Sequence, residues 1–333
     1  MFRLIKYIGF LTLLLLFAAC RQERNAYYTI DGFTQGTSYH IIYHDVQQRD
    51  LSPAIDSILK DFSKSLSVYD SLSLISKINR NETTEVDQYF AQVFHRAKEI
   101  YNDTRGALDI SAAPLFNAWG FGFKKREKVT PQLIDSLKTF TGMDKVRLEG
   151  RQIVKSDARI TFNMNAIAQG YSVDVVCEWF ASQGIADYLV EIGGEIRCHG
   201  KNKKGNQWAV GIDKPEENNM TAGEHLQTVV HFTNRAMATS GNYRKFYVEN
   251  GEKYSHTINP ASGRPVTHSL LSATLFTADA MTADAYATVC MVVGLERAKE
   301  ILQQHPEWGA YLIYEKDGML QTFTTADVQD MMK

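Results

Sequence analysis

Apolar side chains recur every three or four residues in two long segments of the N-terminal half of the chain. The first segment is Leu51–Val68 and the second is Val86–Tyr101. The apolar positions are Ile55, Ile58, Leu59, Phe62 and Leu66 in the first, and Tyr89, Val93, Phe94, Ala97 and Ile100 in the second. This spacing lines one side of a helix with apolar groups. We therefore expect two amphipathic helices, each with one buried side.

Short apolar runs between turn residues predict strands in much of the remaining chain. Residues Tyr27–Tyr43 are typical of two strands joined by a bend at Thr34–Thr37. Other strands are expected at Val146–Leu148, Ile153–Lys155, Ile160–Phe162 and Tyr188–Ile192, with several short ones within Trp208–Phe276, and other helices at Ala168–Ser182, Met281–Val292 and Leu295–Gln304. Because helices and strands do not alternate regularly, this order predicts an α+β fold with mixed or antiparallel sheets and flanking helices.

The first nineteen residues are typical of an export signal. Arg3 and Lys6 precede an apolar stretch that is shorter than the roughly 20 residues needed to span a bilayer. The stretch ends in Phe17–Cys20, which resembles a bacterial lipobox. We expect residues 1–19 to be removed, Cys20 to be lipidated, residues 20–26 to form a tether and residues 27–333 to form the folded domain. A plain secretory signal or an uncleaved leader is the alternative. The expected location is the bacterial cell envelope, facing the periplasm and most simply on the inner membrane.

The overall composition is that of a folded protein. The 333 residues are 44% hydrophobic and 22% charged, which excludes a disordered or collagen-like chain and allows one large domain or two lobes. The 36 basic and 38 acidic residues give a net charge of -2, so we expect no nucleic acid partner. Beyond Cys20, the cysteines are Cys177, Cys198 and Cys290, which form no CxxC pair. Buried thiols are favoured over a Cys177–Cys198 bridge, and a zinc site is not expected.

Asp284 and Thr288 are four residues apart, so a helix would place both on one side. A carboxylate and a hydroxyl are oxygen ligands of the kind that Mg²⁺ prefers, with the remaining ligands coming from phosphates or water. The alternative is an acidic residue near a helix start together with a threonine in the core. Spacing alone favours this alternative.

Two further segments combine small and polar residues. Asn163–Tyr171 leads from a polar turn into a helix, where free amides suit an ion or a phosphate, although Asn163 or Asn165 as an ordinary helix cap is the simpler interpretation. Ile192–Ile196 contains a glycine pair that permits close approach of a ligand to the backbone. It matches neither a Rossmann fingerprint nor a P-loop, and a tight turn is the simpler interpretation.

His256 precedes a turn made rigid by Pro260, Gly263 and Pro265. Loops held in this way often carry functional groups, and a histidine can transfer a proton near neutral pH. A structural role is the alternative. The chain has no GxSxG motif, so a hydrolase triad is not supported.

Taken together and in this order, the motifs resemble those of the ApbE family over essentially all of the chain after residue 26. They are Gly32–Thr37, Ser67–Asn79, Thr104–Ile110, Pro114–Leu115, Trp119–Gly122, Ala168–Tyr171, Ile192–Glu195, His256–Pro260, Gly263–Pro265 and Thr282–Ala285. The resemblance implies a two-lobed, T-fold-like α+β architecture. It also implies an FAD:protein FMN transferase, which uses Mg²⁺ and transfers FMN from FAD to a threonine hydroxyl of an acceptor protein, with release of AMP. The implied acceptors are flavoprotein subunits of membrane redox complexes of the sodium-pumping NADH:quinone reductase (Nqr) and Rnf types.

The resemblance also assigns roles to individual residues. The implied metal ligands are Asp284, Thr288 and the backbone carbonyl of Ala166. The implied FAD contacts are Gln35, Tyr69, Ala107, Leu108, Asp109, Asn163, Gln169 and Ile258, with Tyr69 suited to stacking on the flavin ring. His256 matches a histidine that acts on the acceptor hydroxyl as a base or an orienting group. Asn163 and Gln169 depart from the family pattern, because many members carry an acidic residue at the first position and a charged one at the second.

Three other functions fit the same motifs. The first is a Mg²⁺-dependent FAD pyrophosphatase, in which water replaces the threonine and the products are FMN and AMP. The second is a non-catalytic FAD-binding lipoprotein, and the third is a lipid-anchored scaffold without a ligand.

Overall fold

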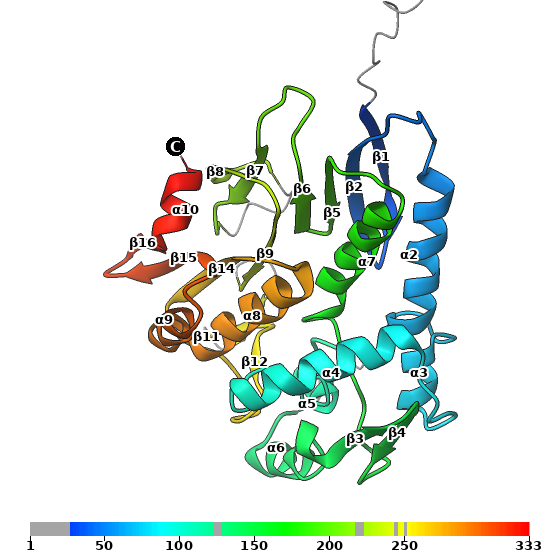
Figure 1. Ribbon diagram of the computed structural model, residues 1–333. Coiled ribbons are helices and arrows are strands. Elements are labelled where there is room, and N and C mark those ends of the chain that lie inside the picture. The colour runs from blue at the N-terminus through cyan, green and yellow to red at the C-terminus, as the bar shows by residue number, and fades with distance from the viewer. Residues whose placement is uncertain (1–26, 123–127, 217–222, 243–245, 250–251, 333) are drawn as a thin grey trace, which may run out of the picture.

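An eight-stranded antiparallel sheet organises the molecule (Figure 1). The structure is a computed structural model that describes residues 27–122, 128–216, 223–242, 246–249 and 252–332. The sheet order is β1-β2-β5-β6-β9-β14-β15-β16. These strands are β1 (Tyr27–Thr34), β2 (Thr37–His44), β5 (Tyr188–Ile192), β6 (Glu195–His199), β9 (Arg235–Gly241), β14 (Leu270–Thr277), β15 (Gly309–Lys316) and β16 (Met319–Thr324).

Helices and two-stranded hairpins surround this sheet. The helices are α2 (Ser52–Leu66), α3 (Leu74–Asn79), α4 (Gln88–Asp103), α5 (Ala113–Ala118), α6 (Pro131–Lys138), α7 (Ala168–Ser182), α8 (Ala280–Val293), α9 (Leu295–Gln304) and α10 (Ala326–Met331), with a 3₁₀ turn at Met143–Lys145. The hairpins are β3–β4 (Val146–Glu149, Gln152–Lys155), β7–β8 (Trp208–Asp213, Leu226–Phe232), β10–β11 (Phe246–Glu249, Glu252–Ser255) and β12–β13 (Ile258–Asn259, Arg264–Pro265).

The two faces of the sheet are covered differently. Along β5, Val190 and Ile192 pack against α2 and α7, whereas Leu189, directly before Val190, packs on the opposite side against the β7–β8 hairpin. Such alternation follows from the two-residue period of a strand. In Figure 1, α7 and α8 lie in front of the sheet, and α3 to α6 with the β3–β4 hairpin form a second group below it. The apolar contacts of α4, α7 and α8 join the two groups into one core.

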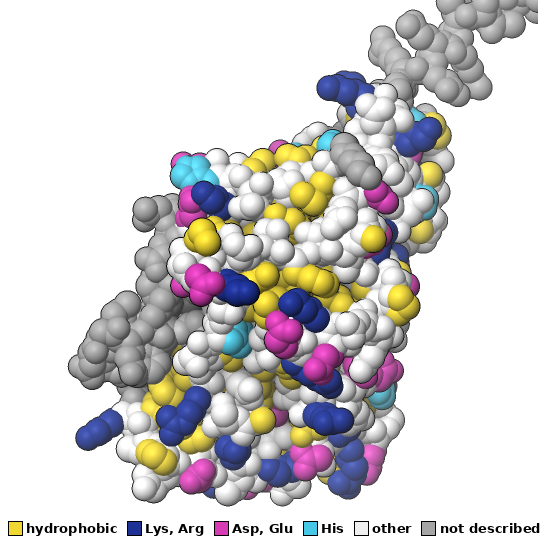
Figure 2. Space-filling model, turned by 90° about the vertical axis from the view of Figure 1, so that its left-hand side faces the viewer, with side chains coloured by type: hydrophobic (Ala, Val, Ile, Leu, Met, Phe, Trp, Pro, Cys, Tyr) yellow, Lys and Arg dark blue, Asp and Glu magenta, His cyan; other side chains and the backbone are white. Residues whose placement is uncertain are grey.

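Charged side chains are well mixed on the face seen in Figure 2. Lys and Arg lie among Asp and Glu, with hydrophobic side chains exposed between them. This mixture agrees with the nearly balanced numbers of basic and acidic residues in the sequence. Within the part of the chain that the structure describes, none of the helices is both long and apolar enough to cross a bilayer.

Most of the predicted elements are confirmed. The expected amphipathic helices are α2 and α4, and the helix expected at Ala168–Ser182 is α7 with the same bounds. The predicted α+β class is confirmed, with antiparallel pairing throughout the main sheet. Cys177, Cys198 and Cys290 are buried free thiols. The predicted signal, the lipidated Cys20 and the tether all lie outside the described residues.

The strand predicted at Ile160–Phe162 is wrong. Only one isolated bridge forms there, between Thr161 and Ala112. The side chain of Asn79 explains the difference, because it accepts from the backbone N–H of Phe162 at 2.7 Å and donates to the carbonyl of the same residue at 2.9 Å. Both backbone groups that a neighbouring strand would use are therefore already bonded.

Helices α7 and α8 approach each other closely at Gly170. A Cβ atom built on Gly170 would overlap the carbonyl oxygen of Ala280 and would lie 2.8 Å from Cβ of Asp284. Helix α8 is buried on nearly every side and cannot shift without disturbing the core. The close contact of the two helices therefore requires glycine at position 170.

We expect Gly170→Ala to lower the free energy of unfolding by about 2–3 kcal/mol, because an overpacked core forces its neighbours to move. Denaturant titration followed by circular dichroism measures this change. The control is Glu178→Ala on the exposed side of α7, which should stay within about 0.5 kcal/mol of the wild type. Equal stability of the two variants would contradict the required close contact.

Candidate functional site

Asp284 connects the middle of α8 to the first turn of α7. Its carboxylate is buried and accepts a hydrogen bond from the backbone N–H of Gly170 at 3.0 Å. Thr288 lies one turn further along α8, and its hydroxyl is 3.1 Å from the hydroxyl of Ser240 on β9. Ala166 precedes the start of α7 by two residues. The structure thus brings Asp284 to the helix start that follows Ala166, with Thr288 one turn further along α8.

Neither asparagine in front of α7 caps the helix. The N-cap residue is Ile167, which makes no capping hydrogen bond through its side chain. Asn163 instead accepts from the backbone N–H of Asn165 at 2.9 Å, and its own N–H donates to the carbonyl of Ile110. The simpler interpretation of this segment as an ordinary cap is therefore wrong. The first-turn amide of Gly170 is satisfied from another helix, by Asp284.

Asp174 fixes the position of α8. Its carboxylate accepts from the backbone N–H groups of Ala280 and Met281 at 2.9 and 2.8 Å, and it pairs with Arg197 of β6 at 2.8 Å. Burial raises the pKa of Asp174 to about 6, although Arg197 and the two amides oppose that shift. One buried carboxylate therefore holds α7, α8 and β6 together.

Glu195 is a second buried carboxylate near Asp284. It is only 9% exposed, and its Oε2 atom has no hydrogen-bond partner among the described residues. Burial raises the pKa of both carboxyl groups, and the charge of Asp284 raises the pKa of Glu195 further. A buried carboxylate oxygen without a donor is costly unless it gains a cation or a proton. The pair therefore has the chemistry of a site for a hard cation.

Besides the two carboxylates, the possible metal ligands are mainly hydroxyl and main-chain oxygen atoms. Among the described residues, no group of three or more His, Cys, Asp or Glu side chains is arranged to hold a metal ion. A cation here would therefore draw on hydroxyl and main-chain oxygens beside the buried carboxylates. The set predicted from the sequence, Asp284, Thr288 and the carbonyl of Ala166, is of this kind, and such oxygen ligands are those that Mg²⁺ prefers.

Three turns that are distant in the sequence meet at Gln169. Its Nε2 donates to the carbonyl of Ile192 at 3.1 Å. Gly193 has φ +65°, and a Cβ on it would overlap Gln169 and lie 2.7 Å from Cγ2 of Thr37. The predicted tight turn at the glycine pair is confirmed. Gln35, in the turn between β1 and β2, has φ +52°, and its buried Nε2 has no partner in the described part of the chain.

The segment at residues 107–109 is a buried turn. Asp109 accepts from the backbone N–H and the hydroxyl of Ser111 at 2.8 and 2.6 Å, and burial raises its pKa. The carboxylate of Asp109 thus stabilises its own turn. The hydrogen bond from Asn163 to Ile110 holds this turn next to the loop before α7.

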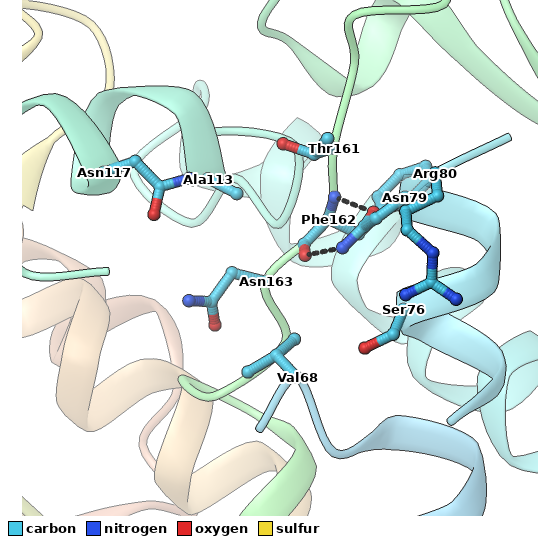
Figure 3. A pocket seen from close by; sticks show the side chains of 9 residues that line it. All are labelled: Val68, Ser76, Asn79, Arg80, Ala113, Asn117, Thr161, Phe162 and Asn163. Carbon is cyan, nitrogen blue, oxygen red and sulfur yellow. Dashed lines mark hydrogen bonds between the residues drawn. The ribbon is translucent and has the colours of Figure 1, made fainter. Parts of the chain in front are cut away.

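A cavity of about 270 Å³ opens beside this loop (Figure 3). Its lining residues are Val68, Ser76, Asn79, Arg80, Ala113, Asn117, Thr161, Phe162 and Asn163. Figure 3 shows Asn163 between Asn117 on one side and Val68 on the other. Next to Val68, Tyr69 is 66% exposed, and its hydroxyl is 3.4 Å from the amide of Asn165. The ring of Tyr69 is therefore accessible to a planar ligand at the edge of the cavity.

His256 and Ile258 belong to a separate loop. Ile258 is buried against Ala112 and Leu115, and Val266 closes the loop through a hydrogen bond to the carbonyl of Thr257. His256 is half-buried, with its ring edge-on to Phe121 at a centroid distance of 6.4 Å. The indole of Trp119 donates to the carbonyl of Gly263 at 2.8 Å. The histidine loop is thus fixed against the aromatic segment that follows α5.

Sequence reasoning missed Asp174, Arg197 and Glu195. Asp174 stands between the apolar Val173 and Val175, and Glu195 and Arg197 alternate with the apolar Ile196 and Cys198, which is a pattern compatible with buried charges. In the segment that contains Glu195, the sequence pattern assigns a role only to the glycine pair before it. The signal was therefore present, but it does not reveal which partner each charge faces.

Comparisons with known proteins identify a family and several similar proteins. A family model described as "ApbE family" matches residues 35–312. A Haemophilus influenzae protein named FAD:protein FMN transferase is 34% identical, and the alignment covers 95% of this chain and 94% of that protein. A protein of the same name from Vibrio cholerae is 35% identical, with 87% and 88% covered.

Solved structures resemble this chain over most of its length. The flavin transferase ApbE from Vibrio cholerae superposes with a TM-score of 0.81 at 32% identity, covering 92% of this chain and 99% of that structure. The apo form of the flavinyl transferase ApbE from Pseudomonas stutzeri gives a TM-score of 0.82 at 26% identity, covering 92% and 97%.

The buried carboxyl group of Asp284 should make the metal-free protein lose stability as the pH rises. Its folded pKa, about 7, lies above the unfolded value near 3.9, so the folded state holds the extra proton between these values. Stability from this group is therefore complete below about pH 4 and is lost as the pH rises through about 7. We expect Asp284→Asn, which cannot ionise, to gain stability relative to the wild type between pH 5 and 8.

The measurement is urea unfolding of both proteins in EDTA across this pH range. Subtracting the unfolding free energies of the two proteins cancels the contributions of groups that both contain, such as His268. Its lowered pKa makes stability change with pH in the opposite direction. A difference that does not change with pH, or one that favours the wild type as the pH rises, would contradict the assignment.

Proposed function

The chain belongs to the ApbE family, and from this premise we propose that it is an FAD:protein FMN transferase. In this proposal a threonine hydroxyl of an acceptor protein attacks the phosphorus on the FMN side of the FAD pyrophosphate. The bond from that phosphorus to the AMP side breaks, AMP leaves, and FMN remains attached to the acceptor through a phosphoester. The names of the relatives in Haemophilus influenzae and Vibrio cholerae support this activity.

One observation carries the proposal, namely the contact of Asp284 with the first turn of α7. It joins buried oxygen ligands to a helix start, and helix starts favour anions such as phosphate. Mg²⁺, if bound by Asp284, Thr288 and the carbonyl of Ala166, would supply positive charge to the pyrophosphate. Phosphoryl transfer depends chiefly on positioning and charge neutralisation, which these groups are suited to provide.

FAD would lie across the segments that meet around the start of α7. We assign FAD contacts to Gln35 and Gln169 in the adjoining turns, and to Asn163 at the cavity. The exposed ring of Tyr69 suits stacking on the flavin. The remaining assigned contacts are Ala107, Leu108, Asp109 and Ile258, of which Asp109 acts through the turn that it stabilises. The unpartnered Nε2 of Gln35 is a donor that a bound ligand would satisfy.

We assign His256 to the acceptor hydroxyl, as a base or an orienting group. Its half-buried ring lies in a loop that Val266 and Trp119 hold in place. A fixed histidine of this kind can accept the proton of the attacking threonine. The acceptor in our proposal is a flavoprotein subunit of a membrane redox complex of the Nqr or Rnf type.

Replacing His256 by Ala should leave FAD bound and slow FMN transfer by about 10²- to 10⁴-fold, the usual contribution of a general base. Replacing Asp284 by Ala should abolish transfer, because the cation would lose its charged ligand. Mass spectrometry of an acceptor fragment, incubated with FAD and Mg²⁺, measures the FMN-sized mass gain. His231→Ala, at an exposed histidine of β8, is the matched control and should transfer normally.

The same assay separates the alternative functions. Free FMN and AMP without acceptor labelling would make the protein a pyrophosphatase. Bound FAD with neither AMP nor labelling would favour a flavin carrier, and absence of FAD binding would favour a scaffold. Loss of FAD binding in His256→Ala would show that His256 has a structural role instead.

We also propose that the chain is lipidated at Cys20 and anchored in the bacterial envelope, facing the periplasm. The support is the sequence pattern of residues 1–20. Cys20→Ala should abolish incorporation of labelled palmitate and release the protein from the membrane fraction, since both depend on the lipidated thiol. Cys290→Ala is the control with a buried thiol and should remain labelled. Labelling that persists in Cys20→Ala would refute the anchor.

A further inference from the structure

Glu195 and Arg197 lie on the side of β6 that faces α7 and α8. The residues between and after them, Ile196 and Cys198, pack on the opposite side against the β7–β8 hairpin. Side chains alternate across a strand, so Glu195 and Arg197 share the other face. Arg197 confirms this direction, since its guanidinium reaches Asp174 of α7 at 2.8 Å.

The register of these elements places Glu195 level with Asp284. Strand β6 runs parallel to α7, because the antiparallel strand β5 comes between them in the chain. Starting from the contact of Arg197 with Asp174, a step of two residues back along the strand covers about 6.6 Å, and a step of four residues back along the helix covers about 6 Å. The two steps are therefore nearly equal in length. The first step leads to Glu195 and the second leads to Gly170, whose N–H binds Asp284.

The groups around Glu195 are already engaged. Arg197 binds Asp174, and the N–H of Gly170 donates to Asp284. The Oε2 atom of Glu195 stays buried without a partner among the described residues, and the charge of Asp284 acts directly on it. Two buried carboxylates thus lie at one level, and one of them keeps an oxygen without a partner among the described residues, an arrangement that a cation would stabilise.

We propose that Glu195 is a further ligand of the cation site, binding a divalent cation together with Asp284, either directly or through a water molecule on the ion. This inference rests on the proposed function, which places the cation at Asp284, Thr288 and Ala166. Glu195 adds a second negative charge to a site that otherwise has one. A site with two carboxylates keeps its cation more tightly, whereas phosphate oxygens arrive only with the nucleotide.

The test compares cation binding by the full chain and its Glu195→Gln variant. Glutamine keeps the shape of the side chain and removes its charge. The probe is Mn²⁺, whose free fraction is measured by electron paramagnetic resonance, alone and with ADP, whose pyrophosphate stands in for that of FAD. Thermal unfolding in EDTA is measured in parallel.

The matched control is Glu191→Gln, on the neighbouring strand and on the opposite face of the sheet, where its Oε1 accepts from the N–H of Gly194 at 2.7 Å. We expect Glu195→Gln to weaken Mn²⁺ binding at least 10-fold without lowering the unfolding temperature in EDTA, because the variant also removes repulsion from Asp284. Glu191→Gln should change the affinity less than threefold. Glu195→Asp, which keeps the charge, should recover part of the lost affinity.

Unchanged Mn²⁺ affinity in a folded Glu195→Gln variant would overturn the proposal and leave Glu195 as a buried protonated acid. If Glu195→Gln failed to fold, Glu195→Asp would decide, because Mn²⁺ binding weaker than in the wild type but tighter than in Asp284→Ala supports the proposal, and wild-type affinity opposes it. If the wild type bound no Mn²⁺ with or without ADP, the cation of the proposed function would itself be wrong. That outcome differs from failure of the Glu195 proposal alone, in which the wild type binds Mn²⁺ and Glu195→Gln binds it equally well.

Discussion

One buried carboxylate, that of Asp174, fixes how α7, α8 and β6 lie around the proposed cation site. It accepts the first two amides of α8 and the guanidinium of Arg197 on β6, so a side chain of α7 sets the register of two other elements. Because helix starts leave amides unsatisfied, a buried carboxylate is a strong and directional partner for them. The spacing of Gly170, Asp284 and Glu195 follows from this contact.

The antiparallel sheet explains why the remaining parts of the site come from turns. The β1–β2 turn and the β5–β6 turn lie at the same end of their strands. There Gln169 donates to the carbonyl of Ile192 and packs closely against Gly193. The loop before α7 adds Asn163 and the cavity in Figure 3. A rigid sheet with functional turns at one end suits a ligand as long as a dinucleotide, because each segment contacts a different part of it.

The sequence predicted what depends on local spacing. The periodicity of α2, α4 and α7 was sufficient to place those helices, and the four-residue separation of Asp284 and Thr288 identified a shared helix side. The predicted strand at Ile160–Phe162 was wrong because its backbone binds Asn79, more than 80 residues earlier. The roles of Asp174 and Glu195 were missed for the same reason, since Asp174 binds α8 and Glu195 faces Asp284, and both are distant in the chain. The proposed reaction came from the motifs taken together, which no single spacing defines.

The three buried thiols have a practical consequence for studying how the molecule opens. Cys177, Cys198 and Cys290 lie on α7, β6 and α8, the same three elements that Asp174 joins. Burial raises the pKa of each thiol, so few of them are ionised in the folded chain, and thiol reagents react chiefly with the thiolate. Each cysteine is therefore a native reporter of local opening at one element. The rates of thiol modification would reveal whether the three elements separate together or one at a time, without any added label.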